Sequence, residues 1–375
     1  MLSQYTSALC RTYTITCPAC NLDNAFPRLK RDIFRARTSE PDDHPLEVGW
    51  RAENVEIPIW VTPLSFFWGV CPNCFYAGQV DNAEFRTWKK NATKFKNQFS
   101  EGILDNLAEQ ANAGQGFAQT VGKAMDPNDV YGTTLIHFFL GIHSEYLKNS
   151  PVVGTLARSY LRVAWLYRDQ ERLFQDFSGS SGIQELLKET GDAWNIAIRS
   201  NSDLSVQPQL VTDELSALRQ TLAYFELNFS ALQSSASEDE MRLMTLIAEI
   251  AYRIYELSGI EEDFTKAQSG FSGTMQKCLS VVNDKSIVGG AVNRAKDTLE
   301  KAGDRGRELR TLQTKWEKMP PGERLVVATP PPPEPAPPKG SETPETESTP
   351  EKPAPPPPVS GDMAELQQKV TKLDE

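Results

Sequence analysis

Apolar residues recur at two different spacings along the chain, and the spacing changes near residue 82. Before that point, the runs 12–17 (TYTITC) and 57–61 (IPIWV) alternate or carry β-branched residues, which predicts half-buried strands. A third run, 65–70 (SFFWGV), leads directly into a pair of cysteines. The pattern predicts a small β-rich domain over residues 1–82.

From residue 83 to residue 319 the apolar positions follow a helical period. Within 135–146, one helix face carries Leu135, Phe138, Phe139, Ile142 and Tyr146. Two later seams step by threes and fours, and they comprise Leu215, Leu218, Leu222, Phe225, Phe229 and Leu232, then Leu243, Ile247, Ile250, Ile254 and Leu257.

The short polar segment between these two seams, 234–240 (SSASEDE), places Ser237 and Glu240 at the spacing of a capping box. We therefore expect two antiparallel helices joined by a turn there. Residues 248–271 resemble a tetratricopeptide unit, with a turn at Gly259. Because each amphipathic helix must bury its stripe on a neighbour, the pattern predicts a stacked, tetratricopeptide-like α-helical repeat body over 83–319.

The C-terminal part has a different composition. Residues 320–358 hold 16 of the 26 prolines, so we predict a disordered, Pro-rich linker over 320–360. Residues 361–375 follow, where Met363, Leu366, Val370 and Leu373 predict a short amphipathic helix. A helix of this length is marginal alone in water and is sensible if it docks on a partner. A fraying tail with chance periodicity is the alternative. The predicted fold class is mostly α, with a small β-rich zinc-ribbon domain, the repeat body and a disordered tail.

Composition and charge narrow the class of protein. The chain has 375 residues and a net charge of −11, of which the first hundred residues carry +2 and the rest −13. A protein dominated by phosphate contacts would be basic over most of its length. We expect no signal peptide, no membrane span and a cytoplasmic location. Six cysteines are too few for a disulfide-built secreted protein.

Four of the six cysteines form two Cys-Pro-x-Cys pairs, in 16–24 (TCPACNLDN) and 69–78 (GVCPNCFYAG). In such a pair a tight turn presents two thiolates, and two pairs complete a closed tetrahedral site. The predicted metal ligands are Cys17, Cys20, Cys71 and Cys74, holding one structural Zn²⁺. Many such turns place glycine after the second cysteine. Asn21 tolerates the required positive φ, whereas Phe75 does not do so comfortably, so we expect a distorted second turn.

Other readings of the cysteine pairs stay open. A rubredoxin-like iron site uses the same geometry. A thioredoxin-like pair would need a βαβ context, which the pattern lacks. Catalytic zinc is disfavoured because four thiolates leave no position for water. Cys10 and Cys278 are expected to be buried or idle thiols. His137 and His143 are six residues apart, so we expect rim or surface positions rather than a shared site, and His44 is expected to be a loop residue.

Basic residues gather in two places, interleaved with aromatic residues. The clusters are Arg28, Lys30, Arg31, Arg35 and Arg37, and then Arg86, Lys89, Lys90, Lys94 and Lys96. Such clusters form nucleic-acid surfaces in some proteins. A solvated loop and the polar face of a helix are the simpler interpretation, because the same hundred residues hold ten acidic ones.

Several segments together resemble one bacterial family. CPAC at 17–20, RARTSEPDDHP at 35–45, SFFWGVCPNCFYAGQVDNAEF at 65–85 and SYLRVAWLYRD at 159–169 are similar to the family catalogued as domain of unknown function 2225. In that family the second motif is followed by Tyr-Ala and a nearby Phe, here Tyr76, Ala77 and Phe85. The resemblance implies a cytoplasmic zinc-binding protein with a helical-repeat body and no established activity.

No nucleophile motif or phosphate-binding loop appears in the sequence. We therefore predict a non-enzymatic scaffold or adaptor that binds protein partners through its helical repeats and its tethered C-terminal helix. A nucleic-acid-associated regulator that uses the ribbon and the basic clusters is the alternative, and an iron-containing electron carrier is a weaker one.

Overall fold

The computed structural model describes residues 2–52, 55–173, 181–198, 204–232, 237–287 and 289–319. The predicted linker (320–360) and C-terminal helix (361–375) lie outside these ranges. All described residues belong to one compact unit.

The N-terminal part contains one short helix and three separate antiparallel hairpins, which pair β1 with β2, β3 with β4, and β5 with β6. Its elements are α1 (Leu2–Leu9), β1 (Cys10–Thr16), β2 (Asp23–Leu29), β3 (Phe34–Ser39), β4 (Pro45–Trp50), the 3-10 helix η1 (Pro63–Phe66), β5 (Trp68–Val70) and β6 (Ala77–Gln79). The predicted strand at 12–17 is confirmed as β1.

The predicted strand at 57–61 is wrong. Residues 59 and 60 form a turn that Val61 closes by donating its N–H to the Pro58 carbonyl at 3.0 Å. Pro58 has no N–H for a strand ladder, and the apolar side chains of Ile59 and Trp60 face solvent instead of a core.

Helices follow from residue 83 onward. They are α2 (Ala83–Arg86), the 3-10 helix η2 (Trp88–Asn91), α3 (Ala92–Lys96), α4 (Ile103–Ala113), α5 (Phe117–Lys123), α6 (Val130–Tyr146), α7 (Val153–Leu173), α8 (Ser181–Glu189), α9 (Gly191–Ile198), α10 (Glu214–Leu232), α11 (Ser237–Ser258), α12 (Glu261–Asn283) and α13 (Gly290–Lys318).

Helix α6 is buried along almost its whole length, and the five predicted apolar positions between Leu135 and Tyr146 are all 1% exposed or less. Hairpin β5–β6 packs directly on it. The Trp68 ring lies against Gly141, and Ala77 donates its N–H to the Ser144 hydroxyl at 2.9 Å. Small side chains on α6 therefore bring the second cysteine hairpin onto the helical core.

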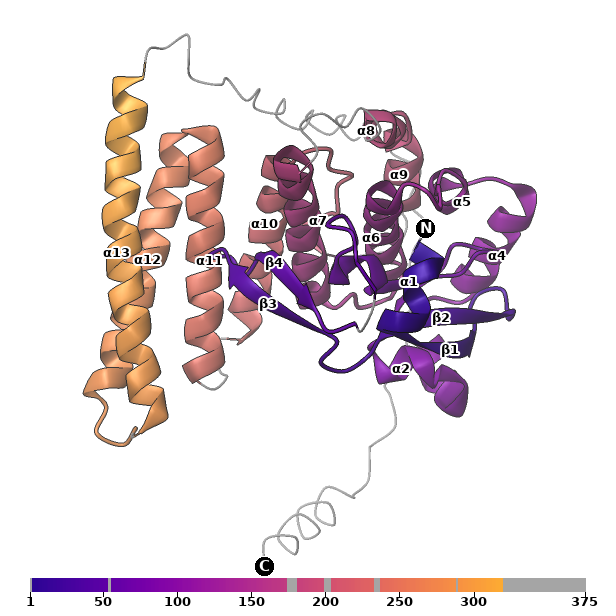
Figure 1. The fold of residues 1–375 in the computed structure, drawn as a ribbon, viewed down its shortest axis with the longest axis horizontal. Helices are drawn as coiled ribbons and strands as arrows, with labels where there is room; N and C mark the ends of the chain where they lie inside the picture. The colour runs from indigo at the N-terminus through magenta and orange to yellow at the C-terminus, as the bar shows by residue number, and fades with distance from the viewer. Residues whose placement is uncertain are drawn as a thin grey trace, which may run out of the picture. The chain divides into compact units, whose positions relative to one another are not determined.

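The C-terminal half is a row of long helices. In Figure 1, α7, α10, α11, α12 and α13 stand side by side, each packed against the next. The predicted turn at Gly259 is confirmed: this residue has φ 63° and separates α11 from α12. Where these helices cross, a Cβ at Gly270 would lie 3.0 Å from the Ala248 Cβ, so small residues permit the close approach.

One hydrophobic core joins the hairpins to the helices. It runs without interruption from Ile15 in β1, through Trp68 and α6, to Leu309 in α13. The predicted boundary after residue 82 separates two kinds of secondary structure, and the two sides share this core. That residue 82 ends a separate domain stays a prediction.

A candidate four-cysteine metal centre

Each Cys-x-x-Cys pair lies in the turn of a hairpin. Cys17 and Cys20 lie between β1 and β2, and Cys71 and Cys74 lie between β5 and β6. In the first turn, Cys17 donates its N–H to Leu22 at 2.8 Å and accepts from Asn21 at 3.0 Å. The second turn repeats this pattern: Cys71 donates to Tyr76 and accepts from Phe75, both at 2.9 Å.

The two turns also share their backbone conformation. Asn21 has φ 59° and Phe75 has φ 58°, so each residue after the second cysteine is left-handed. The expectation of a distorted second turn is therefore wrong. Phe75 is only 8% exposed and packs on Gly122 of α5, so tertiary packing holds a conformation that the residue does not favour alone.

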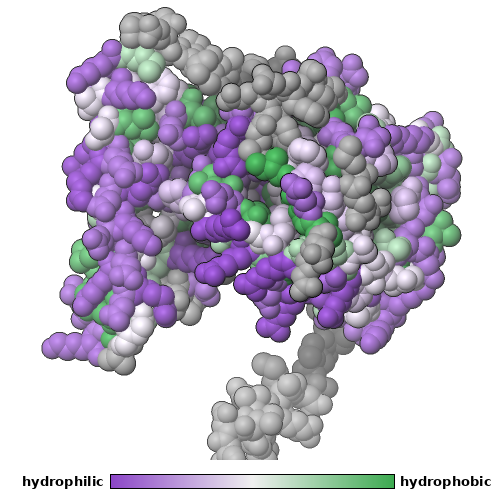
Figure 2. Space-filling view, viewed as in Figure 1, coloured by the Kyte–Doolittle hydropathy of each residue, from purple (hydrophilic) through white to green (hydrophobic). Residues whose placement is uncertain are grey.

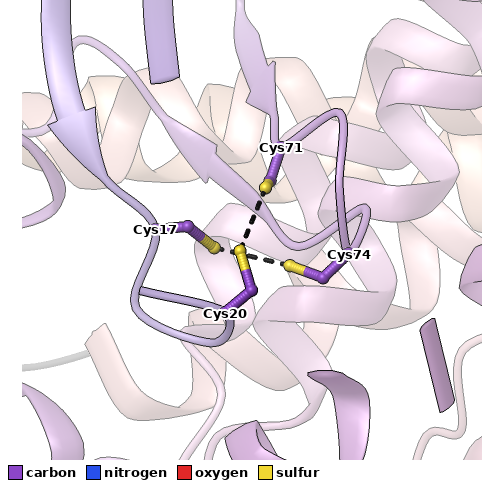
Figure 3. A group of neighbouring side chains, drawn as sticks. All are labelled: Cys17, Cys20, Cys71 and Cys74. Carbon is purple, nitrogen blue, oxygen red and sulfur yellow. Dashed lines mark hydrogen bonds between the residues drawn. The ribbon is translucent and has the colours of Figure 1, made fainter. Parts of the chain in front are cut away.

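The four sulfur atoms converge on one point (Figure 3). Cys17 Sγ lies 3.4 Å from Cys74 Sγ, and Cys20 Sγ lies 3.6 Å from Cys71 Sγ. All four sulfurs lie within 4.8 Å of one another. With Zn–S bonds of about 2.3 Å, a tetrahedral site separates its sulfurs by about 3.8 Å. These separations suit a single ion, and they are far longer than the roughly 2.05 Å of a disulfide.

Polar groups surround the sulfur of Cys71 in particular. Asn24 donates its side-chain amide to it at 3.4 Å, and the Asn73 amide lies 3.9 Å away. The thiols of Cys17 and Cys74, together with backbone N–H groups, lower the pKa of Cys71, whereas the hydrogen bond with Cys71 raises the pKa of Cys17. These sulfur contacts thus favour a thiolate at Cys71 and a protonated thiol at Cys17 and Cys74, whose pKa is also raised, so metal binding would release protons from those two thiols.

The cluster is sheltered from solvent. Cys17, Cys71 and Cys74 are buried, and only Cys20 is half-buried. Trp88 donates its indole N–H to the Thr16 carbonyl at 2.6 Å, which fixes η2 beside the first turn. A site with four protein thiolates can hold an ion and join two hairpins.

The remaining cysteines and the histidines on α6 lie elsewhere. Cys10 and Cys278 are buried, as expected. The expectation that His143 is a rim or surface residue is wrong: this side chain is 5% exposed and packs between Phe117 and Trp194. His137 is half-buried. Burial lowers the pKa of each of these two histidines to about 4.

The two basic clusters are mostly engaged in local contacts or solvated. Arg28 pairs with Asp81 at 2.5 Å, and Lys30 donates to the Ala8 carbonyl at 2.7 Å. Arg86 donates to the Val80 carbonyl at 2.6 Å and lies over the Tyr13 ring. The lysines of η2 and α3 are exposed opposite buried aromatic side chains. This arrangement matches the simpler interpretation, a polar face of an amphipathic segment.

The insertion between the cysteine pairs holds a polar cluster that the sequence did not reveal. Strands β3 and β4 form an arm that reaches the long helices (Figure 1). Its tip buries His44, which is 1% exposed and stacks on Trp165 at 5.4 Å between ring centroids. The His44 ring faces Glu40 through Nδ1 at 3.0 Å and Asp169 through Nε2 at 3.2 Å. His44 is a residue of the loop between β3 and β4, as expected, and its side chain is buried in this cluster.

Arg168 of α7 is the centre of the same cluster. It donates to Asp42 of the arm at 2.9 Å and to Glu214 of α10 at 2.7 Å, and it also pairs with Glu40. Arg253 of α11 shares Glu214 at 2.9 Å. Buried charges arranged in this way are fully paired, so the cluster locks the arm to three helices.

The fold and the site together define the class of protein. It is a mostly helical chain whose N-terminal hairpins form a possible four-cysteine metal site. The chain belongs to the family described as an uncharacterized protein conserved in bacteria (DUF2225), whose sequence profile matches residues 11–286. The resemblance noted in the sequence is thereby confirmed. Neither the curated proteins nor the solved structures include a match to the chain. Within the part of the chain that the structure describes, no helix has the length and apolar character to cross a membrane.

Proposed function

We propose that this chain is a non-enzymatic, zinc-binding scaffold that joins protein partners through its helical body. The observation that carries the proposal is the convergence of Cys17, Cys20, Cys71 and Cys74 within 4.8 Å. Four protein thiolates occupy all four coordination positions of a tetrahedral ion, so no position is left for water or substrate. Zinc suits such a set because it has no redox chemistry and accepts tetrahedral thiolate ligands.

The position of the cysteines supports a structural role for the ion. The first hairpin, β1–β2, is a two-stranded sheet. The second hairpin is also two-stranded, and its strands β5 and β6 are three residues each. Two-stranded hairpins are marginally stable alone in water. An ion shared between their turns would join the first hairpin to β5 and β6, which pack on α6, and would add binding free energy to folding.

The helical body supports the scaffold part of the proposal. Stacked helices offer extended surfaces on which peptides or proteins bind. The expected linker and C-terminal helix, 320–360 and 361–375, would add a second binding element and raise the effective concentration of its partner. Deleting 361–375 tests that element, because an unchanged set of partners in a pull-down would remove it.

The metal is tested on the full-length protein by elemental mass spectrometry and circular dichroism. We expect about one zinc per chain, lost in Cys71→Ser together with part of the ordered structure. Cys278→Ser is the matched control, because Cys278 is also buried but lies next to Met241, far along the chain from the cluster. It should keep its zinc. Iron with visible absorption, or a metal-free protein with a disulfide, would overturn the structural-zinc proposal.

A further inference from the structure

Four elements enclose a pocket of about 570 Å³ below the tip of the arm. Its walls come from α7, α10, α11 and Asp43 of the arm. Figure 2 shows one face of the molecule, on which hydrophilic residues predominate over the C-terminal helices. The volume falls within the usual range for pockets that bind ligands or peptide side chains.

Two arginines one helical turn apart, Arg158 and Arg162, line the α7 wall. Among the described residues, no carboxylate lies within ion-pair distance of either. The other lining arginine, Arg242, is paired with Asp43 at 3.4 Å. Arg158 and Arg162 thus bring two positive charges without an ion-pair partner to the α7 side of the pocket.

Arg162 is held ready for an anion. Its guanidinium carbon lies 4.1 Å above the centre of the Phe67 ring, so stacking fixes the plane of the group. Stacking leaves the N–H edges free to donate, and these edges match the geometry of a carboxylate. Burial, together with the charge of Arg158, lowers the pKa of Arg162 to about 10. The negative charge of a bound anion would offset both of these unfavourable effects.

The rest of the lining indicates what kind of anion fits. The buried rings of Trp165 and Phe225 line the pocket, and half-buried Leu243 and Leu246 lie along α11. Asp239 and Glu240 line the α11 side. Apolar side chains would gain from burial here, whereas the acidic residues oppose a ligand with many negative charges, such as a nucleic-acid strand.

We propose that this pocket binds a short peptide segment of a partner protein, in which one carboxylate engages Arg158 and Arg162 while neighbouring apolar side chains contact the half-buried Leu243 and Leu246. The proposal rests on the proposed scaffold function and specifies its binding surface. Charge-assisted, bidentate contacts with carboxylates are among the stronger polar contacts in proteins, so the arginines should determine which peptides bind.

The test uses a phage library of random dodecapeptides, selected on the full-length protein. We expect the selected peptides to be enriched in Asp or Glu beside Leu, Phe or Ile. Fluorescence anisotropy of synthetic versions should show affinity lowered at least tenfold by Arg158→Gln and by Arg162→Gln. Arg310→Gln, an exposed arginine on α13, is the control and should bind like wild type. Thermal melting confirms that the Arg158 variant, altered at an exposed position, is folded.

A charge exchange makes the test sharper. A selected peptide whose acid is replaced by Lys should bind Arg158→Glu more tightly than it binds wild type. The pocket proposal would be overturned if the selected peptides were not enriched in acidic residues. It would also be overturned if both arginine variants bound the peptides as tightly as wild type does. Either outcome would leave the scaffold proposal intact. A library that yields no binding peptide would count against both the pocket and the scaffold, whereas the metal measurement bears on the zinc site alone.

Discussion

The ring of Phe75 lies directly on the α-carbon of Gly122: a Cβ built on the glycine would stand 2.3 Å from the ring. This contact joins α5 to the second cysteine turn. Phe75 is left-handed at φ 58°, a conformation that costs a non-glycine residue about 1–3 kcal/mol. The bare glycine provides the space in which the ring compensates for that cost by being buried.

Replacing Gly122 with alanine should therefore weaken the metal centre from a distance. We expect Gly122→Ala to lower the free energy of unfolding by about 1–3 kcal/mol, as overpacking does, and to release metal at lower chelator concentration. Urea titration and a colorimetric zinc assay measure the two effects. Gly306→Ala on α13 is the control, because nothing lies within 4 Å of a Cβ there. Equal behaviour of the two variants would show that the Phe75 contact is unimportant.

Arg168 should be among the most sensitive positions in the fold. In Arg168→Met, Asp42 and Glu214 keep their charges but lose their shared partner, and both side chains are only 4% exposed. Breaking a buried pair from one side costs about 3–5 kcal/mol. Arg307→Met removes a similar but exposed ion pair with Asp304 and should change stability by less than about 1 kcal/mol. Urea unfolding measures the loss of free energy of unfolding in each variant. Losses of similar size would contradict the prediction.

The contribution of His44 to the stability of the protein should decrease as the pH rises. Only an imidazolium donates from both ring nitrogens, and here both face carboxylates. Burial opposes the charge, but hydrogen bonds with Asp169 and Glu40 outweigh it and raise the pKa of His44, against the repulsion of Arg168. The stabilisation is therefore complete below the unfolded pKa of about 6.5 and is lost as the pH rises through the raised value.

The stability difference between wild type and His44→Gln should therefore shrink as the pH rises above about 6.5, as urea titrations at each pH can measure. His143 supplies a control of opposite sign. Burial lowers its pKa to about 4, so wild type loses stability relative to His143→Gln as the pH falls below about 6.5. A difference for His44→Gln that stays constant with pH would mean that His44 is neutral throughout.

The basic clusters should not make this chain a nucleic-acid binder. Arg28 is committed to Asp81, and Arg86 to backbone carbonyls of the same loop. We expect anisotropy titrations with a labelled DNA or RNA 20-mer to show no tight binding even at low salt. Replacing Arg28, Lys30 and Arg31 together should then lower stability without changing that result. Steeply salt-dependent binding that the triple variant abolishes would favour the regulator alternative.

The predictable parts of this protein are those governed by local spacing. Cysteines two residues apart must share a turn, and a helix with apolar residues from Leu135 to Tyr146 must bury that face, so both were evident from the sequence. The intrinsic preference of Phe75 predicts a distorted turn, whereas the neighbour that decides its conformation, Gly122, lies 47 positions away. A local preference carries no information about such a contact.

The arm was missed for a related reason. All six residues of β3 are exposed, so no apolar alternation marks the strand. The arm makes its buried polar contacts at its tip. There Asp42 and His44 contact Trp165, Arg168 and Asp169, which lie more than 120 positions away in the sequence. An acidic loop and a charged helix face each look solvated when read alone. Only their mutual pairing makes burial favourable, and pairing over that distance has no periodic signature.

The arm also sets an order of events during synthesis. All four cysteines emerge within the first 74 residues, so an ion can gather the two hairpins early. The acidic tip of the arm, however, has no counter-charge until Arg168 leaves the ribosome, a wait on the order of ten seconds at bacterial elongation rates. With an ion bound to the cysteines, a nascent chain would carry two joined hairpins and a free acidic arm, whose Asp42 could pair with Arg168 only after α7 has been made.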